Sequence, residues 1–446
     1  MKKLLSVIFL LFIASQYYSY SQLIPDSVIS LNTHLDNNYW IKDKKDVYLY
    51  LDLQALKIEL GKKRAPMNIS IVLDHSGSMS GDKMKFAIEA CKFIVNNLSE
   101  EDYLSVIKYD DKVEVVCKSA LVSKKNEIYN LISQISPDGG TNLSGGLLEG
   151  YVQAKSTYDR NRINRVLLIT DGLANAGITD STKLNQIVRN KNLEDGITLS
   201  TFGVGSGFNE RLLTAMAESG NGNYYFIDKA DRINSIFAKE LNGLVSVIAN
   251  NTKVSVNYPS FYLSPSTSFG FKFDLKNNQV NFDLKDVASQ EQKSMLIKFS
   301  IQNQLTENII FNTVLEYDNA ISKIHFTTLT NDTLIPTLDK PKFDLAFNED
   351  AIANIAMFET NVITENAMDD LDSRSYDKCQ AKLGSARAIL VESKKRSPNN
   401  KEIDKQIKIV DEYDRQVEKA KNMKDEELNV MQKAYRSTNY EIKKKK

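Results

Sequence analysis

Cysteine and histidine are scarce in this chain of 446 residues, which has three of each. No two of the six form a CxxC pair or an HExxH motif. This shortage argues against a structural zinc site, a zinc-dependent protease and a disulfide framework. The odd number of cysteines permits at most one disulfide, and Cys91 falls on the apolar stripe of an expected helix, where we predict a buried free thiol.

An excess of charge of one sign is also absent. Lys and Arg total 57 and Asp and Glu total 57, so the formal net charge is zero. Broad electrostatic binding to nucleic acid or to anionic lipid selects basic proteins, and we therefore expect no nucleic-acid partner. The lysines at positions 443–446 are a basic run, but one run this short is weak evidence for binding to an anionic surface.

Long hydrophobic runs are missing after the amino terminus. No later window reaches 18 apolar residues, so we expect no transmembrane span in the mature chain. The amino terminus has a basic start at residues 2–3, an apolar run at residues 4–14 and small residues at 19–21. That run is shorter than the roughly 20 residues that cross a bilayer, and we interpret residues 1–21 as a cleaved signal peptide; an uncleaved anchor is the alternative. Export to the periplasm is expected, with the cell surface or secretion as the other destinations.

Strands and helices alternate only between residues 65 and 248. Asn68–Leu73 is an apolar run rich in β-branched residues, and Arg165–Thr170 is nearly continuous in apolar residues, as expected for a strand buried on both faces of a parallel sheet. Asp110–Asp111 joins two further strands in an expected hairpin. Other strands are expected at residues 197–204 and 223–227, and helices at 83–98, 123–135, 143–158, 182–193, 210–218 and 232–249. The alternation predicts a doubly wound, mostly parallel, Rossmann-like α/β sheet.

The segments on either side of this unit differ from it. Short alternating strands replace helices over residues 249–345, and Asp46–Leu53 is a strand with too few neighbours to form a core alone. We therefore predict that residues 22–64 and 249–345 form one β-sandwich, into which the α/β domain of residues 65–248 is inserted. Residues 346–446 are expected to be helical. The expected helices are 348–371, 375–395 and 401–435, with solvated charged faces and a Lys-rich tail.

Three loops of the α/β unit bring oxygen ligands together. Asp74-His75-Ser76-Gly77-Ser78 follows the first strand, Gly139-Gly140-Thr141-Asn142 precedes a helix, and Thr170-Asp171-Gly172 follows a central strand. In open α/β sheets, loops beyond the carboxyl ends of the strands meet in one crevice. Carboxylates and hydroxyls without imidazole or thiolate suit Mg²⁺, Mn²⁺ or Ca²⁺. The predicted metal ligands are Asp74, Ser76, Ser78, Thr141 and Asp171.

The charge of this ligand set indicates what it binds. If the three hydroxyls coordinate directly while the two carboxylates act mainly through water, the ion keeps an electrophilic open position. A carboxylate from a protein partner is then the expected last ligand. The hydroxyl-rich setting disfavours a catalytic role for the pair of carboxylates, and Ser76 lacks the nearby base that a nucleophile needs.

Neighbouring residues are assigned more ordinary roles. His75 is expected to pack beside the site, and Asp138 and Asn142 to shape the loop around Thr141, through turn chemistry or from the outer shell of the metal. The segment Gly203-Val204-Gly205-Ser206-Gly207 lacks the spacing of a dinucleotide-binding motif and is interpreted as a turn.

The five predicted ligands, in this order, resemble a complete metal-ion-dependent adhesion site of the von Willebrand factor type A (vWA) family. The motif Asp74-x-Ser76-x-Ser78, Thr141 and Asp171 match it. The flanking segments are similar in arrangement to those of bacterial exported vWA proteins of the calcium-activated chloride channel-like group and of inter-alpha-trypsin inhibitor heavy chains. The resemblance implies protein binding that depends on a divalent cation, and it does not imply chloride conduction.

These observations predict an exported binding protein and not an enzyme. Its vWA domain is expected to capture an Asp or Glu carboxylate of a protein partner through the bound ion. The alternative is a structural scaffold subunit of a periplasmic or envelope complex, in which the metal only stabilises the fold. A regulatory subunit like those of the chelatases is disfavoured, because the chain has no P-loop and begins with an export signal.

Overall fold

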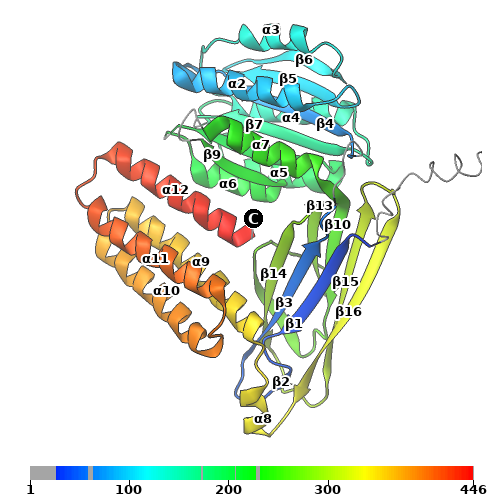
Figure 1. The fold of residues 1–446 in the computed structure, drawn as a ribbon, viewed down its shortest axis with the longest axis vertical. Helices are drawn as coiled ribbons and strands as arrows, with labels where there is room; N and C mark the ends of the chain where they lie inside the picture. Colours follow the sequence, from blue (N-terminus) through cyan, green and yellow to red (C-terminus); the bar gives the residue numbers. More distant parts are fainter. Residues whose placement is uncertain (1–26, 59–63, 172–173, 206, 228–231, 445–446) are drawn as a thin grey trace, which may run out of the picture.

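The computed structural model describes residues 27–58, 64–171, 174–205, 207–227 and 232–444. The signal peptide expected at residues 1–21 and the last two lysines of the tail lie outside the described residues. Figure 1 shows three parts: an α/β domain, a β-sandwich and a helical region. None of the helices in the described ranges has the length and apolarity needed to cross a membrane.

The α/β domain is built on a six-stranded sheet with the order β6-β5-β4-β7-β8-β9. Neighbouring strands are parallel except β5 and β6, which form the expected antiparallel hairpin. The strands are β4 (Met67–Asp74), β5 (Tyr103–Tyr109), β6 (Val113–Leu121), β7 (Ile163–Thr170), β8 (Thr198–Val204) and β9 (Asn221–Ile227). The α-helices are α2 (Asp82–Asn97), α3 (Lys125–Ser133), α4 (Leu143–Ser156), α5 (Ser181–Asp195), α6 (Glu210–Ser219) and α7 (Ile233–Val245). The predicted doubly wound, mostly parallel sheet is confirmed.

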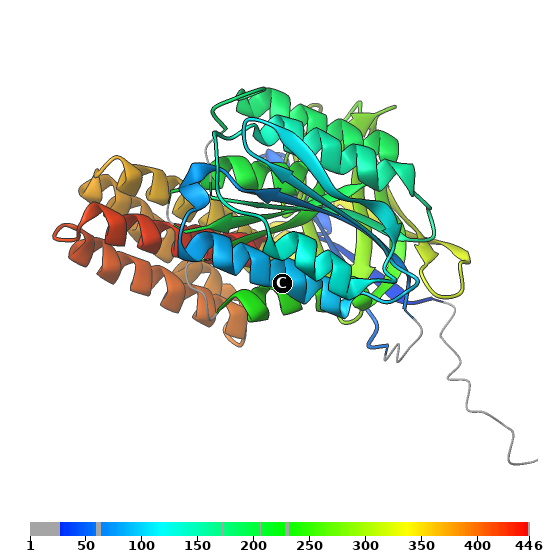
Figure 2. The same cartoon turned by 90° about the horizontal axis from the view of Figure 1, so that it is seen from above.

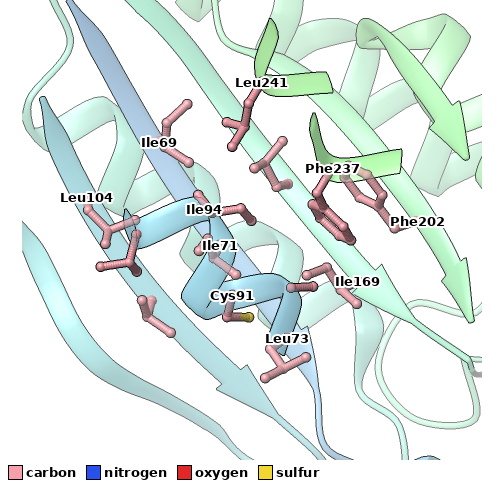
Figure 3. Packing of buried hydrophobic residues seen from close by; sticks show 14 of the residues in the cluster. Ile69, Ile71, Leu73, Cys91, Ile94, Leu104, Ile169, Phe202, Phe237 and Leu241 are labelled. Carbon is pink, nitrogen blue, oxygen red and sulfur yellow. The ribbon is translucent and has the colours of Figure 1, made fainter. Parts of the chain in front are cut away.

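Helices cover both faces of this sheet. On one face, Ile71 of β4 lies in a buried cluster with Cys91 of α2 and Phe237 of α7 (Figure 3). On the other face, Val72 of β4 shares a cluster with Leu147 of α4. Burying one such side chain contributes about 1.5–3 kcal/mol, so β4 is held firmly from both sides. Cys91 is buried and free, as predicted.

The β-sandwich combines strands from before and after the α/β domain. One sheet has the order β1-β3-β14-β11, in which β3 lies between β1 and β14. The other has the order β12-β13-β10-β15-β16-β2. The strands of the first sheet are β1 (Ile29–Leu35), β3 (Asp46–Ala55), β11 (Leu263–Phe269) and β14 (Gln292–Ile301). Those of the second are β2 (Tyr39–Trp40), β10 (Val247–Asn257), β12 (Asp274–Lys276), β13 (Gln279–Ala288), β15 (Ile309–Asn319) and β16 (His325–Pro336).

The two sheets of the sandwich share one apolar core, to which β3 contributes Leu49, Leu51 and Leu53. The amino ends of the parallel strands of the α/β domain face this sandwich. Arg165, near the start of β7, lies 3.2 Å from a carboxylate oxygen of Asp286 in β13. The carboxyl ends of the same strands, where the loops gather, therefore point away from the sandwich.

One expected helix is too long. The sequence pattern predicts a helix over residues 232–249, whereas α7 ends at Val245 and β10 begins at Val247. The reason is tertiary: Ile248 and Ala249 are buried in the core of the sandwich, and β10 pairs with β13 and β15. Packing against another domain thus overrides the local helical pattern.

The helical region follows β16. Its helices are α8 (Lys340–Leu345), α9 (Glu349–Asp372), α10 (Tyr376–Arg396), α11 (Lys401–Ala420) and α12 (Asp425–Lys444). The helix expected at 401–435 is wrong, because α11 ends at Ala420 and α12 runs on to Lys444. Backbone hydrogen bonds from Asn422 and Met423 close a turn there. Figures 1 and 2 show α12 beside the α/β domain, and Tyr440 stands edge-on to Tyr224 of β9.

The charged face of α12 also departs from the sequence-based expectation. Lys433 is buried, and Lys443 lies 2.8 Å from Glu218 of α6. The charge pattern predicts that these lysines are solvated together with the tail. They instead line the contact between α12 and the α/β domain.

Candidate metal centre

Asp74 ends β4, the strand at the centre of the sheet, and its carboxylate is held by two donors. The backbone N–H of Ser76 donates to Oδ1 at 2.9 Å, and the Thr170 hydroxyl donates to Oδ2 at 2.5 Å. Because Thr170 ends the adjacent strand β7, the carboxylate is fixed between the ends of two strands. Both residues are buried.

A chain of hydrogen bonds connects Asp171 with the two serines of the first loop. The hydroxyl oxygens of Ser76 and Ser78 lie 3.1 Å apart, and the Ser78 hydroxyl donates to Asp171 Oδ1 at 2.8 Å. Ser78 lies in a short 3₁₀ turn, η2 (Gly77–Met79), whose apolar residue Met79 is buried beneath it. The structure thus brings four of the five predicted ligands into one bonded cluster.

Thr141 joins this cluster through its loop. Gly77 N–H donates to the Gly139 carbonyl oxygen at 3.1 Å, so the second loop is bonded to the first. The Asn175 side-chain oxygen accepts from Thr141 N–H at 2.7 Å, and Asn175 N–H donates back to the Thr141 carbonyl oxygen at 3.1 Å. All three loops are therefore interlocked, and Thr141 is buried between them.

The electrostatics of the cluster fit a cation. Burial raises the pKa of Asp74, hydrogen bonds from Ser76 and Thr170 oppose that rise, and the charge of Asp171 adds to it. Burial also raises the pKa of Tyr109, and the charge of Asp74 raises it further. Within the described residues, Asp74 has hydrogen-bond donors but no ion pair, and a divalent cation would supply the missing positive charge.

The composition of the cluster narrows the kind of cation. In the described ranges no group of three or more His, Cys, Asp or Glu side chains is placed to hold a metal ion. A metal centre here consequently depends on hydroxyl oxygens in addition to the two carboxylates. That donor set suits a hard ion such as Mg²⁺, Mn²⁺ or Ca²⁺ and not zinc.

Sequence reasoning missed three residues of the site. Asp111, expected only as a turn residue, accepts a hydrogen bond from Gly140 N–H at 2.9 Å through its carboxylate. Asn175 holds Thr141 through two hydrogen bonds. Lys83 of α2 forms an ion pair with Asp171. Each of these contacts joins residues far apart in the chain, and no local pattern signals them.

The neighbouring residues behave largely as expected. His75 lies beside the site, where its Nδ1 is 3.0 Å from the Ser136 carbonyl oxygen. Asn142 caps α4 by accepting from Gly145 N–H. Of the turn predicted at 203–207, Gly203 and Val204 belong instead to β8, Gly205 has a positive φ of 76°, and residue 206 lies outside the described residues.

Comparison with known proteins identifies the α/β domain. Residues 68–239 match the von Willebrand factor type A domain family. The chain contains a vWA domain. Domains of this family commonly take part in protein–protein interaction and adhesion.

Two relatives are similar to this chain over about half of its length. Uncharacterized protein YfbK of Escherichia coli (strain K12) is 30% identical over 243 residues, which are 53% of this chain and 42% of that protein. Inter-alpha-trypsin inhibitor heavy chain H2 of Homo sapiens is 28% identical over 214 residues, which are 46% of this chain and 22% of that protein. The chain therefore spans less than half the length of these two relatives.

A solved structure supports the fold beyond the vWA domain. The structure of a von Willebrand factor type A protein from Catenulispora acidiphila has a TM-score of 0.68 at 14% identity. The match covers 85% of this chain and 88% of the Catenulispora acidiphila chain. At this identity the likeness shows a shared fold and nothing about function.

Proposed function

We propose that this chain is an exported binding protein whose vWA domain holds a divalent cation and uses it to capture a carboxylate of a protein partner. The ion is Mg²⁺, with Mn²⁺ or Ca²⁺ as the alternatives. When bound, it supplies a Lewis acid with one exchangeable coordination position. The observation that carries the proposal is the bonded cluster of Asp74, Ser76, Ser78 and Asp171 beside Thr141.

The accessibility of the cluster supports binding of a partner. Asp74 and Thr141 are buried, whereas Gly77 and Ser78 are exposed. The site therefore opens to the surface on the side of η2 and is closed on the side of the sheet. A carboxylate on another protein can approach through the open side without any rearrangement of the strands.

The same geometry favours binding over catalysis. The imidazole of His75 faces the Ser136 carbonyl oxygen and the carboxylate of Asp110, and it makes no hydrogen bond to Ser76 that would activate a nucleophile. The two carboxylates of the cluster are held by donors that keep them fixed. We therefore propose that the chain is not an enzyme.

The sequence carries the proposal of export. A cleaved signal peptide over residues 1–21 places the mature chain outside the cytoplasm, and the periplasm is the proposed location. The alternative locations are the cell surface and the medium.

A titration of the EDTA-treated chain with Mg²⁺ tests the metal site. We expect the wild type to bind, and Thr141→Ala and Asp171→Asn to weaken binding by at least about ten-fold. Thr182→Ala and Asp377→Asn are matched controls, because both residues are exposed and lie on helices α5 and α10, outside the three loops that carry the ligands. Equal binding by all variants would contradict the assigned ligands.

Partner capture is tested with the immobilised chain and envelope extracts. The expected result is retention of specific proteins by the wild type in Mg²⁺, their release by EDTA, and no retention by Asp74→Ala. Retention that survives both EDTA and the substitution would contradict metal-dependent capture. If EDTA lowers the melting temperature but releases no partner, the chain is instead a scaffold with a stabilising metal.

A further inference from the structure

Lys83 is a cation already placed at the site. It lies in the first turn of α2, and its ammonium forms an ion pair with Asp171 Oδ2. The same ammonium donates to the Ser78 carbonyl oxygen at 3.1 Å. The Asp171 side chain is 0% exposed and that of Lys83 is 34% exposed, so the lysine reaches from the surface to a buried carboxylate.

A glycine on a different loop makes room for this reach. Gly205 follows β8 with a φ of 76°, and a Cβ atom added there would lie 2.9 Å from Lys83 Cε. The positive φ favours glycine, and the missing Cβ atom leaves space for the aliphatic stem of the lysine. The stem of Lys83 therefore passes close to the backbone of the loop after β8.

The charges of the cluster show what the lysine does. Asp74 and Asp171 bring two negative charges, and Lys83 is the cation that the structure places in direct contact with either of them within the described residues. Asp171 Oδ1 already accepts from Ser78, and Oδ2 is occupied by the ammonium. A divalent ion that draws on Asp171 must therefore share this carboxylate with Lys83 or displace it.

We propose that Lys83 is the counter-ion of the metal-free site and competes with the divalent cation for Asp171, which lowers the affinity of the site for the metal. This inference rests on the proposed function, since it concerns the same ligands. Lys83 acts through Asp171 and is a positioning residue. Because Lys83 balances the charge of Asp171, the site stays intact without metal and exchanges its ion readily.

The test is calorimetric titration of Mg²⁺ into the full EDTA-treated chain, with no partner present. Lys83→Met should bind Mg²⁺ roughly ten-fold more tightly than the wild type, because one positive charge a few ångströms from the ion is removed. Lys85→Met is the matched control: it lies on the same helix, pairs with Asp82 at the surface, and should leave the affinity unchanged.

A melting experiment separates this effect from a general loss of structure. In EDTA, Lys83→Met should melt at a lower temperature than Lys85→Met, and saturating Mg²⁺ should remove the difference. If Lys83→Met is unfolded in EDTA, refolding by excess Mg²⁺ supports the inference, and failure to refold overturns it. Lys83→Arg keeps the positive charge and should stay within about three-fold of the wild-type affinity.

The outcomes distinguish the inference from the proposed function. If Lys83→Met binds Mg²⁺ more tightly than the wild type and Lys85→Met does not, both the metal site and the competition by Lys83 are supported. If the wild type binds Mg²⁺ and Lys83→Met binds it with equal or lower affinity, the role of Lys83 is overturned and the metal site stands. Absence of Mg²⁺ binding from both proteins overturns the metal site and the competition together.

Discussion

Lys433 of α12 places its ammonium 4.0 Å from the centre of the Phe208 ring and donates a hydrogen bond of 2.9 Å to the Phe208 carbonyl oxygen. Phe208 lies in the loop between β8 and α6, three residues after Gly205. The side chain of Lys83 passes over Gly205. The helical region therefore contacts a loop that also borders the metal centre. This contact joins the carboxyl-terminal helix to the edge of the sheet that bears the predicted ligands.

We predict that Lys433→Met loosens this loop. Losing the hydrogen bond and the contact with the ring should lower the free energy of unfolding by about 1–3 kcal/mol. Hydrogen exchange at residues 207–213 should become faster, as measured by mass spectrometry. Lys424→Met, at an exposed position before α12, is the control. Unchanged exchange in Lys433→Met would show that α12 does not hold the loop.

The pH dependence of stability should contain a contribution from Glu210. Burial raises the pKa of Glu210 to about 7, against the lowering effects of Lys433, Arg436 and the Tyr224 hydroxyl. Because the folded carboxyl binds its proton more tightly than the unfolded one, this contribution is present below the unfolded pKa of about 4.5 and is lost as the pH rises through about 7.

Glu210→Gln removes this titration. Between about pH 5 and pH 8, the free energy of unfolding of the wild type should fall relative to that of Glu210→Gln by on the order of 2 kcal/mol. Urea denaturation at a series of pH values measures this difference. Glu100→Gln, at an exposed position, should run parallel to the wild type. A constant difference across the pH range for Glu210→Gln would refute the assignment.

Arg165 should be essential for the junction between the vWA domain and the sandwich. Its guanidinium lies 2.8 Å from Glu240 of α7 and 3.2 Å from Asp286 of β13, and the Glu240 side chain is 0% exposed. Arg165→Met removes this guanidinium from the two carboxylates and should cost about 3–5 kcal/mol in urea unfolding. Arg160→Met breaks the more exposed pair with Asp318 and should cost at most about 1 kcal/mol. Equal costs would argue against a special role for Arg165.

Alanine substitution at two glycines should change the stability of the chain in opposite directions. A Cβ atom on Gly222 of β9 would lie 2.0 Å from the Leu199 carbonyl oxygen, whereas one on Gly243 of α7 would meet nothing within 4 Å. Gly222→Ala should destabilise the chain by more than about 2 kcal/mol, since backbone atoms must move. Gly243→Ala should stabilise it by up to about 1 kcal/mol through helix propensity. Thermal melting compares the two, and a Gly222→Ala variant as stable as the wild type would contradict the close approach of β8 and β9.

The fold of the vWA domain was predictable because its signals are local. β4 and β7 each contain a run of apolar residues, as expected for strands that are buried on both faces. Each run ends in a polar residue, Asp74 in β4 and Thr170 in β7. Parallel strands place such ends at one edge. The isolation of Asp46–Leu53 in the sequence predicts that this strand joins the strands after the inserted domain, and the structure pairs β3 with β14.

The parts that escaped prediction depend on contacts between distant residues. Lys83 and Asp171 are 88 residues apart, and Lys433 contacts Phe208 across 225 residues. Lys433 and Lys443 of α12 have the pattern of a solvated face. Contacts with the Phe208 loop bury Lys433, and an ion pair with Glu218 of α6 leaves Lys443 half-buried. The end of α11 at Ala420 is likewise a consequence of α12 turning back to reach the vWA domain.

The place where the vWA domain joins the sandwich determines how separable the two are. Gln290 N–H donates to the Leu56 carbonyl oxygen and Ser289 N–H to that of Ser246, at 3.2 and 2.8 Å. The chain thus leaves the sandwich and returns to it beside two consecutive residues. A short turn from Leu56 to Ser246 would restore an uninterrupted sandwich, and another domain with neighbouring termini would fit in the same place. The vWA domain is thus an insertion that could be replaced without a change in the strand register of the sandwich.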